Sequence, residues 1–150
     1  MQRNVRQVGI RLSSDEKKLV EAICDALSYE GSAVSPSQLF STAGLDEAST
    51  LGFTTSNLEG PKRRPPGLWK HKPDRSYSAL NVDERKKDAL TITIHPLHLG
   101  PIAKAAEWAQ VKVPTFLWGA LMAWTARRKK AEPQNENLQR VELPAQYEPR

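Results

Sequence analysis

Apolar and polar residues alternate in two short stretches of this chain, which predicts two β-strands. The first stretch covers residues 5–12, and its apolar members are Val8, Ile10 and Leu12. The second covers residues 89–95, and its apolar members are Leu90, Ile92 and Ile94. In each stretch polar or small residues take the positions between. Each strand is therefore expected to bury one face and expose the other.

Two helices are predicted after each strand. After the first strand, Ser13 and Glu16 form the signature of a capping box, and apolar residues follow at helical spacing to about Ser28. A second helix is expected to start at Ser35-Pro36 and to fade near residues 44–48. After the second strand, the corresponding helices are predicted over residues 97–110 and 115–130. The middle of the last helix, residues 116–124, is apolar nearly all round, which predicts burial on every side.

The order strand, helix, helix thus occurs twice, and an internal repeat of this kind indicates the architecture. We expect a first unit at 1–48, a basic linker at 49–88, a second unit at 89–131 and a disordered tail at 132–150. The two units are not equal in length, because 24 residues separate Leu12 from Pro36 but only 20 separate Ile94 from Pro114. The first unit should therefore contain a longer turn or one extra helical turn.

Charge and cysteine content narrow the functional classes. The chain has 22 Lys and Arg against 17 Asp and Glu, a net charge of +5, which favours polyanionic partners without requiring them. Its single cysteine, Cys24, lies among apolar residues, so a buried and inert thiol in a reducing compartment is expected. The start of the chain lacks the apolar core of a signal peptide, and the longest apolar stretch, residues 113–126, is too short to span a bilayer. These features predict a cytoplasmic protein without membrane contact.

Enzymatic chemistry finds little support in the sequence. The three histidines are His71 in the linker, His95 at a strand end and His98 at a helix start, and no Cys, Asp or Glu lies near enough in sequence to His95 and His98 to complete a metal shell. Phosphate-binding glycine loops and nucleophile motifs are absent. We expect no catalytic residue, no metal and no cofactor.

The two units resemble the ribbon-helix-helix family of DNA-binding proteins, which includes the Arc and MetJ repressors. The resemblance covers residues 5–48 and 89–130, and it is carried by the run Gln7–Leu12 before a capped helix and by the helix starts Ser35-Pro36 and Val113-Pro114. It implies a mainly α fold with a two-stranded antiparallel ribbon. Two copies in one chain imply a monomeric tandem pseudo-dimer, similar to accessory proteins of conjugation and T-DNA transfer.

The resemblance implies sequence-specific binding of double-stranded DNA, with the ribbon in the major groove. The protein would act as a transcriptional regulator or as a relaxosome-type accessory protein of DNA transfer. The side chains on the outer face of the ribbon suit base readout; they are Gln7, Gly9, Arg11, Thr91 and Thr93. Phosphate contacts are expected from cations and from the starts of the second helices; these residues are Arg3, Arg6, Ser35, Ser37, Lys112, Thr115, Lys62, Arg63 and Arg64.

Three alternatives stay open. The basic segment around Arg63, with Trp69 and Tyr77 nearby, is either a solvated linker or a segment that follows the phosphate backbone. A helix-turn-helix over residues 102–121 is a second DNA-binding interpretation. The fold could also serve as a protein-interaction module, such as an antitoxin-like or phage-encoded inhibitor. A relaxase or another protein is a further candidate partner, and assembly of several chains on DNA is left open.

Overall fold

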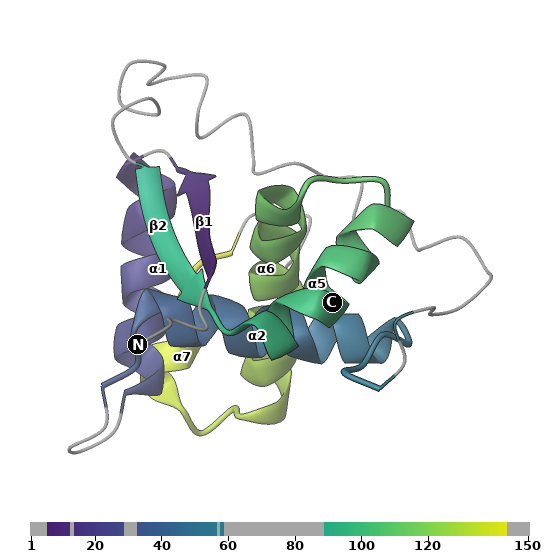
Figure 1. Ribbon diagram of the computed structural model, residues 1–150. Helices are drawn as coiled ribbons and strands as arrows, with labels where there is room; N and C mark the ends of the chain where they lie inside the picture. Colours follow the sequence, from purple (N-terminus) through teal and green to yellow (C-terminus); the bar gives the residue numbers. More distant parts are fainter. Residues whose placement is uncertain (1–5, 13, 29–32, 57, 59–88, 144–150) are drawn as a thin grey trace.

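The computed structural model describes residues 6–12, 14–28, 33–56, 58 and 89–143. These contain, in chain order, β1 (Arg6–Arg11), α1 (Ser14–Leu27), α2 (Pro36–Thr50), β2 (Ala89–Ile94), α5 (Pro96–Trp108), α6 (Val113–Ala131) and α7 (Glu136–Gln139). Figure 1 shows the two strands side by side, with helices behind and below them. The fold is therefore mainly helical with one two-stranded sheet, as the sequence predicts. No helix of the described residues is long and apolar enough to cross a membrane.

The two strands pair antiparallel, although about eighty residues separate them in sequence. Val8 lies opposite Ile92 and Ile10 opposite Leu90, so the apolar positions of both strands fall on one face. Ile10, Ile92 and Ile94 are buried on that face, and Val8 and Leu90 pack partly buried against the core. A two-stranded ribbon alone is marginal in water, and the helices under its inner face supply the burial that it needs.

The helices contact the ribbon in a reciprocal way. Helix α2, which follows β1 in the chain, packs against β2, whereas α6, which follows β2, packs against β1. The two helices also pack against each other. Gly44 allows this close approach, because a Cβ atom at this position would lie 2.7 Å from Cδ2 of Leu117 and 3.1 Å from Cδ1 of Ile102. The sequence suggests that α2 fades near Gly44 or Ala48, but the helix continues to Thr50.

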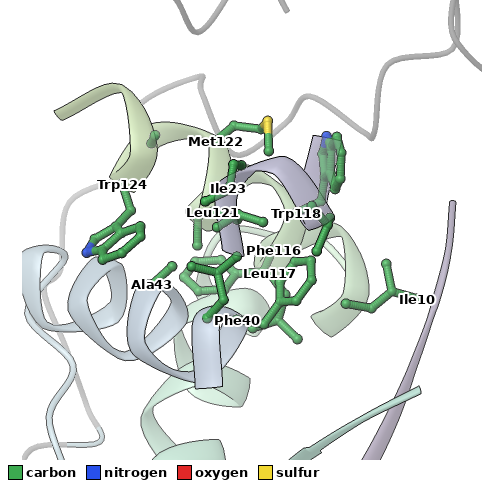
Figure 2. Close-up of a cluster of buried hydrophobic side chains, with 14 of the residues drawn as sticks. Ile10, Ile23, Phe40, Ala43, Phe116, Leu117, Trp118, Leu121, Met122 and Trp124 are labelled. Carbon is green, nitrogen blue, oxygen red and sulfur yellow. The ribbon is translucent and has the colours of Figure 1, made fainter. Parts of the chain in front are cut away.

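Helix α6 forms the centre of the hydrophobic core. Every residue from Phe116 to Ala126 is buried, which confirms the burial predicted for the middle of this helix. Figure 2 shows its side chains beside those of α1, α2 and β1, with Ile23, Phe40, Ala43 and Ile10 among them. The core is thus one cluster to which both halves of the chain contribute.

The difference in spacing between the two halves lies in the connection between their two helices. Helices α1 and α5 have 14 and 13 residues, so neither carries an extra helical turn. Residues 28–35 connect α1 to α2, whereas only residues 109–112 connect α5 to α6. The longer connection between the helices of the first half therefore accounts for the four additional residues.

Two segments that the sequence assigns to linker or tail belong to the core. Phe53, inside the expected linker 49–88, is buried, and its ring centroid lies 5.8 Å from that of Trp108. The expected disordered tail from residue 132 instead contains α7, which packs against α1 and buries Leu138, followed by Val141 and Leu143. The tail prediction is wrong for these residues, because a few isolated apolar side chains give no periodic signal yet still fill space beside α1. Residues 144–150 lie outside the described part of the chain.

Candidate nucleic-acid interface

The outer face of the ribbon gathers the five residues predicted to read bases. Gln7, Gly9 and Arg11 of β1 and Thr91 and Thr93 of β2 are all exposed. Gln7 lies opposite Thr93, and Gly9 lies opposite Thr91. Hydrogen-bonding side chains therefore stand on the solvent face of a ribbon whose other face is buried.

Gly9 leaves the middle of β1 without a side chain on the outer face. A Cβ atom built on Gly9 would have no heavy atom within 4 Å, so the space above it is open. A double helix could approach the backbone closely at this point, because no side chain of β1 rises there.

The start of α2 is fixed to one end of the ribbon. Ser35 is the N-cap of α2 and accepts a hydrogen bond from the Gln38 N–H, while the Gln38 side chain accepts one from the Ser35 N–H. Ser37 Oγ accepts a hydrogen bond from the Thr93 N–H at 3.0 Å. The two serines predicted as phosphate contacts thus cap the helix and hold β2. Their first role in this structure is positioning.

The start of α6 differs in being uncapped by a side chain. Lys112 occupies the N-cap position, is exposed and makes no capping hydrogen bond. Thr115 lies partly buried in the first turn. A cation next to the positive end of a helix dipole is unfavourable by itself, but a bound anion would interact favourably with both. Lys112 is therefore an exposed cation at a helix start, as the predicted phosphate contact requires.

The other cations predicted to contact phosphate are Arg6, Arg3, Lys62, Arg63 and Arg64, and the end of α6 carries further basic residues. Arg6 is exposed at the end of β1, opposite Ile94. Arg3, Lys62, Arg63 and Arg64 lie outside the described residues. The end of α6 is also basic, and charge alone would make it a candidate DNA-binding surface. Most of its basic side chains, however, form ion pairs or hydrogen bonds within the protein.

Within the end of α6, Arg127 forms ion pairs with Asp46 and Glu47 of α2. Arg128 pairs with Glu132 and stacks over the ring of Trp124. Lys129 is buried, and its Nζ donates a hydrogen bond to the carbonyl oxygen of Val141. These contacts bind α6 to α2 and to the C-terminal segment.

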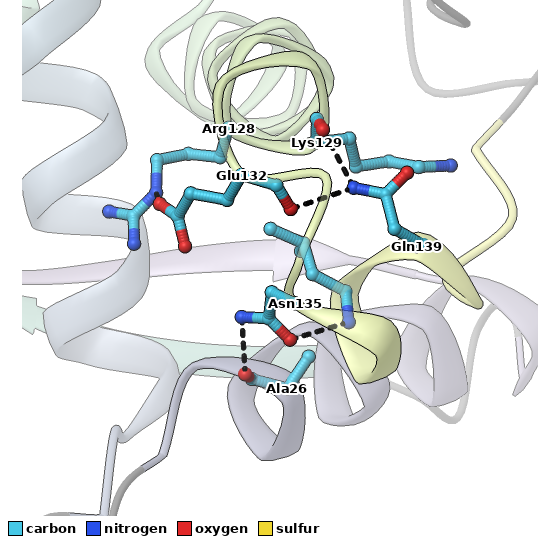
Figure 3. A network of polar contacts seen from close by, with 7 residues as sticks. Ala26, Arg128, Lys129, Glu132, Asn135 and Gln139 are labelled. Atoms are coloured by element: carbon cyan, nitrogen blue, oxygen red, sulfur yellow. Dashed lines mark hydrogen bonds and ion pairs between the residues drawn. The ribbon is translucent and has the colours of Figure 1, made fainter.

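Hydrogen bonds join the C-terminal segment around α7 to two other helices. Asn135 caps α7 by accepting a hydrogen bond from the Leu138 N–H, and its side-chain amide donates to the Ala26 carbonyl. Gln139 donates to the carbonyls of Lys129 and Glu132 (Figure 3). The segment is thus joined to the ends of both α1 and α6.

The two histidines within the described residues lie at the start of α5. His95 is the N-cap of α5, and its Nδ1 accepts a hydrogen bond from the Leu97 N–H at 3.1 Å. The ring of His98 lies 5.9 Å from that of His95. Among the described residues no group of three or more His, Cys, Asp or Glu could hold a metal ion. His71 falls outside this part of the chain.

The helix-turn-helix alternative conflicts with the packing of α6. A recognition helix must present an exposed face to the groove. In α6, however, residues 116–126 are buried, and Trp118 is 0% exposed. This helix packs against β1 and has no free face along its middle.

Protein-family models, curated protein sequences and solved structures contain no match to this chain. Its function must therefore be inferred from the fold and from the chemistry of its exposed surfaces.

Proposed function

We propose that this chain is a tandem ribbon-helix-helix pseudo-dimer that binds double-stranded DNA sequence-specifically, with the ribbon in the major groove. The observation that carries the proposal is the exposed outer face of β1 and β2, where Gln7, Arg11 and Thr93 stand above a buried inner face. A major groove is wide enough for a two-stranded ribbon, and Arg, Gln and Thr have defined partners on base edges.

The packing supports the pseudo-dimer. Each half of the chain supplies a strand and two helices in the same order, and each second helix packs on the strand of the other half. In a symmetric dimer of two chains, the same reciprocal contact would join two subunits. A single chain with both halves forms its ribbon without a second copy.

A sequence-specific binder of this kind would serve as a transcriptional regulator or as an accessory protein at a site of DNA transfer. In the second role a relaxase would be a natural protein partner. DNA fragments retained by the purified protein would separate the two roles, because their genomic position shows whether the site lies at a promoter or at a transfer origin.

The first prediction compares Arg11→Ala with Lys112→Ala. Loss of a bidentate base contact should cost about 1–3 kcal/mol on the preferred site and relax selectivity at one base pair. Loss of a phosphate contact should weaken binding to all sequences alike and reduce the salt slope by about one. Binding of the preferred and a scrambled duplex, titrated by fluorescence anisotropy at several salt concentrations, measures both effects.

The same titrations test the proposal itself. Affinity of the wild-type chain for duplex DNA should fall steeply as salt rises, since phosphate contacts release counterions. Equal, sequence-blind losses in both variants would contradict readout by the ribbon. Absence of duplex binding at low salt would refute the proposed function and favour the protein-interaction alternative.

A further inference from the structure

The register of the ribbon places Gly9 of β1 directly opposite Thr91 of β2. Two positions away on one side Gln7 lies opposite Thr93, and two positions away on the other side Arg11 lies opposite Ala89. In the repeat, Arg11 corresponds to Thr93, because each directly precedes the last apolar residue, Leu12 or Ile94, of its alternating stretch. The pseudo-two-fold axis therefore passes between Gly9 and Thr91.

The residue types do not follow this symmetry. Where the first half has Arg11, the second has Thr93, so a charged forked donor at one end corresponds to a short hydroxyl at the other. Gln7 joins Thr93 at the second end. In a dimer of identical chains the two ends of the ribbon would carry the same side chains. Here they are chemically different.

We infer that the ribbon reads a non-palindromic duplex in one fixed orientation, with Arg11 on a G·C pair and with Gln7 and Thr93 on A·T pairs. This inference rests on the proposed function and specifies its substrate. The guanidinium of Arg matches O6 and N7 of guanine, the amide of Gln matches N6 and N7 of adenine, and the methyl group of Thr packs on the thymine methyl. The two ends therefore favour different bases.

The spacing of the two preferences follows from the strand geometry. Gln7 and Arg11 are four residues apart on β1, which corresponds to roughly 13 Å at a rise of about 3.3 Å per residue. Base pairs rise about 3.4 Å each, so the two preferences should lie about four base pairs apart. A site with G·C at one position and A·T about four pairs away lacks two-fold symmetry, so the protein would bind it in one orientation only.

The surroundings of the two ends reinforce this polarity. At the Thr93 end, the Thr93 N–H is hydrogen-bonded to Ser37 at the capped start of α2, and the exposed Arg6 lies opposite Ile94, in phase with the inner face of the ribbon. In Figure 1 the C-terminal end of β1 and the first turn of α6 both lie toward the top, away from the start of α2. Helix α6 packs on β1, and its N-cap residue Lys112 makes no capping hydrogen bond. The backbone contacts available at the two ends thus differ as well.

Selection of binding sites from a pool of random duplexes tests the inference, with two variants that make the equivalent positions 11 and 93 alike in opposite ways. Thr93→Arg places Arg at both equivalent positions, and Arg11→Thr places Thr at both. Both side chains are exposed, and the Thr93 N–H that bonds Ser37 is kept, so the fold should persist; circular dichroism checks this.

The wild-type chain should select a site without two-fold symmetry, with one G·C preference. Thr93→Arg should select G·C at both positions, and its affinity for the wild-type site should fall at least about fivefold. Arg11→Thr should select G·C at neither position. A palindromic wild-type site, or unchanged selection by both variants, would overturn the inference while leaving DNA binding intact. If the wild-type chain binds no duplex, the proposed function fails and the inference fails with it.

Discussion

At the residue scale, several polar side chains stabilise the fold through hydrogen bonds to the backbone. His95 caps α5, Ser37 holds the edge of β2 and Lys129 reaches the Val141 carbonyl from a buried position. Each of these residue types is also common in binding sites, so composition does not separate the two uses. Only the position of the hydrogen-bond partner does.

Cys24 gives a prediction at this scale. Burial, together with the neighbouring carboxylates of Asp25 and Glu21, raises the pKa of its thiol to about 11. At pH 8 only about one thiol in a thousand would be ionised, and the thiolate is the reactive form. Reaction with Ellman's reagent should therefore be very slow in the native protein at pH 8, accelerate as the pH rises toward 11, and become fast in urea. Rapid reaction of the folded protein at pH 8 would contradict a buried, inert thiol.

At the element scale, two helices end with the same hydrogen-bond pattern but with different residues. After α2, Gly52 adopts a φ of 102°, and the Phe53 N–H donates to the Ala48 carbonyl. After α5, Gln110 adopts a φ of 62°, and the Val111 N–H donates to the Ala106 carbonyl. Both are Schellman endings, in which glycine is the preferred residue at the left-handed position. Gln110 occupies that position at a steric cost.

Gln110→Gly should therefore stabilise the protein. A left-handed backbone costs a residue with a Cβ atom roughly 1–2 kcal/mol, and substitution by glycine removes this cost. Glycine also gives the unfolded chain greater conformational freedom, which offsets part of the stabilisation. We expect a net increase of about 0.5–1 kcal/mol in the free energy of unfolding, measured by urea denaturation. The matched change Gly52→Ala should act in the opposite direction by about 1 kcal/mol. If Gln110→Gly destabilises the protein, the contacts of the glutamine side chain stabilise the fold by more than the left-handed backbone costs.

At the scale of the whole molecule, one core joins both halves and the C-terminal segment. Leu138 of α7 is 0% exposed, and Phe53 packs on Trp108 from beyond the end of α2. The ribbon rests on this core through Ile10, Ile92 and Ile94. Loss of packing in the C-terminal segment should thus lower the stability of the entire protein.

Leu138→Ala tests this connection. Removal of a fully buried leucine side chain should lower the free energy of unfolding by about 2–5 kcal/mol, because transfer energy is lost and a cavity remains. Asn137→Ala, at an exposed position on the same short helix, should change it by less than about 0.5 kcal/mol. Thermal or urea unfolding of both variants measures the difference. Equal, small effects would mean that the segment is not part of the cooperative core.

Much of the fold was accessible from local patterns. Alternation predicted both strands and their exposed faces, the prolines at 36 and 114 marked the starts of two helices, and the apolar run 116–124 predicted a buried helix. These features depend on neighbours within a few residues, which is the range over which periodicity and capping act. The five residues of the outer ribbon face were found in this way, because a strand with one buried face must expose the other.

The sequence by itself therefore determined both strands, the helices α1, α2, α5 and α6, their buried faces and the candidate readout residues, but not α7. The tertiary structure alone decided the register that sets Gly9 opposite Thr91, the pairing of Arg127 with α2, and the entry of Phe53 and Leu138 into the core. Each of these depends on contacts between residues far apart in the chain. Local spacing carries no information about such contacts, whereas packing of the whole chain selects them by the apolar surface they bury and the charges they pair.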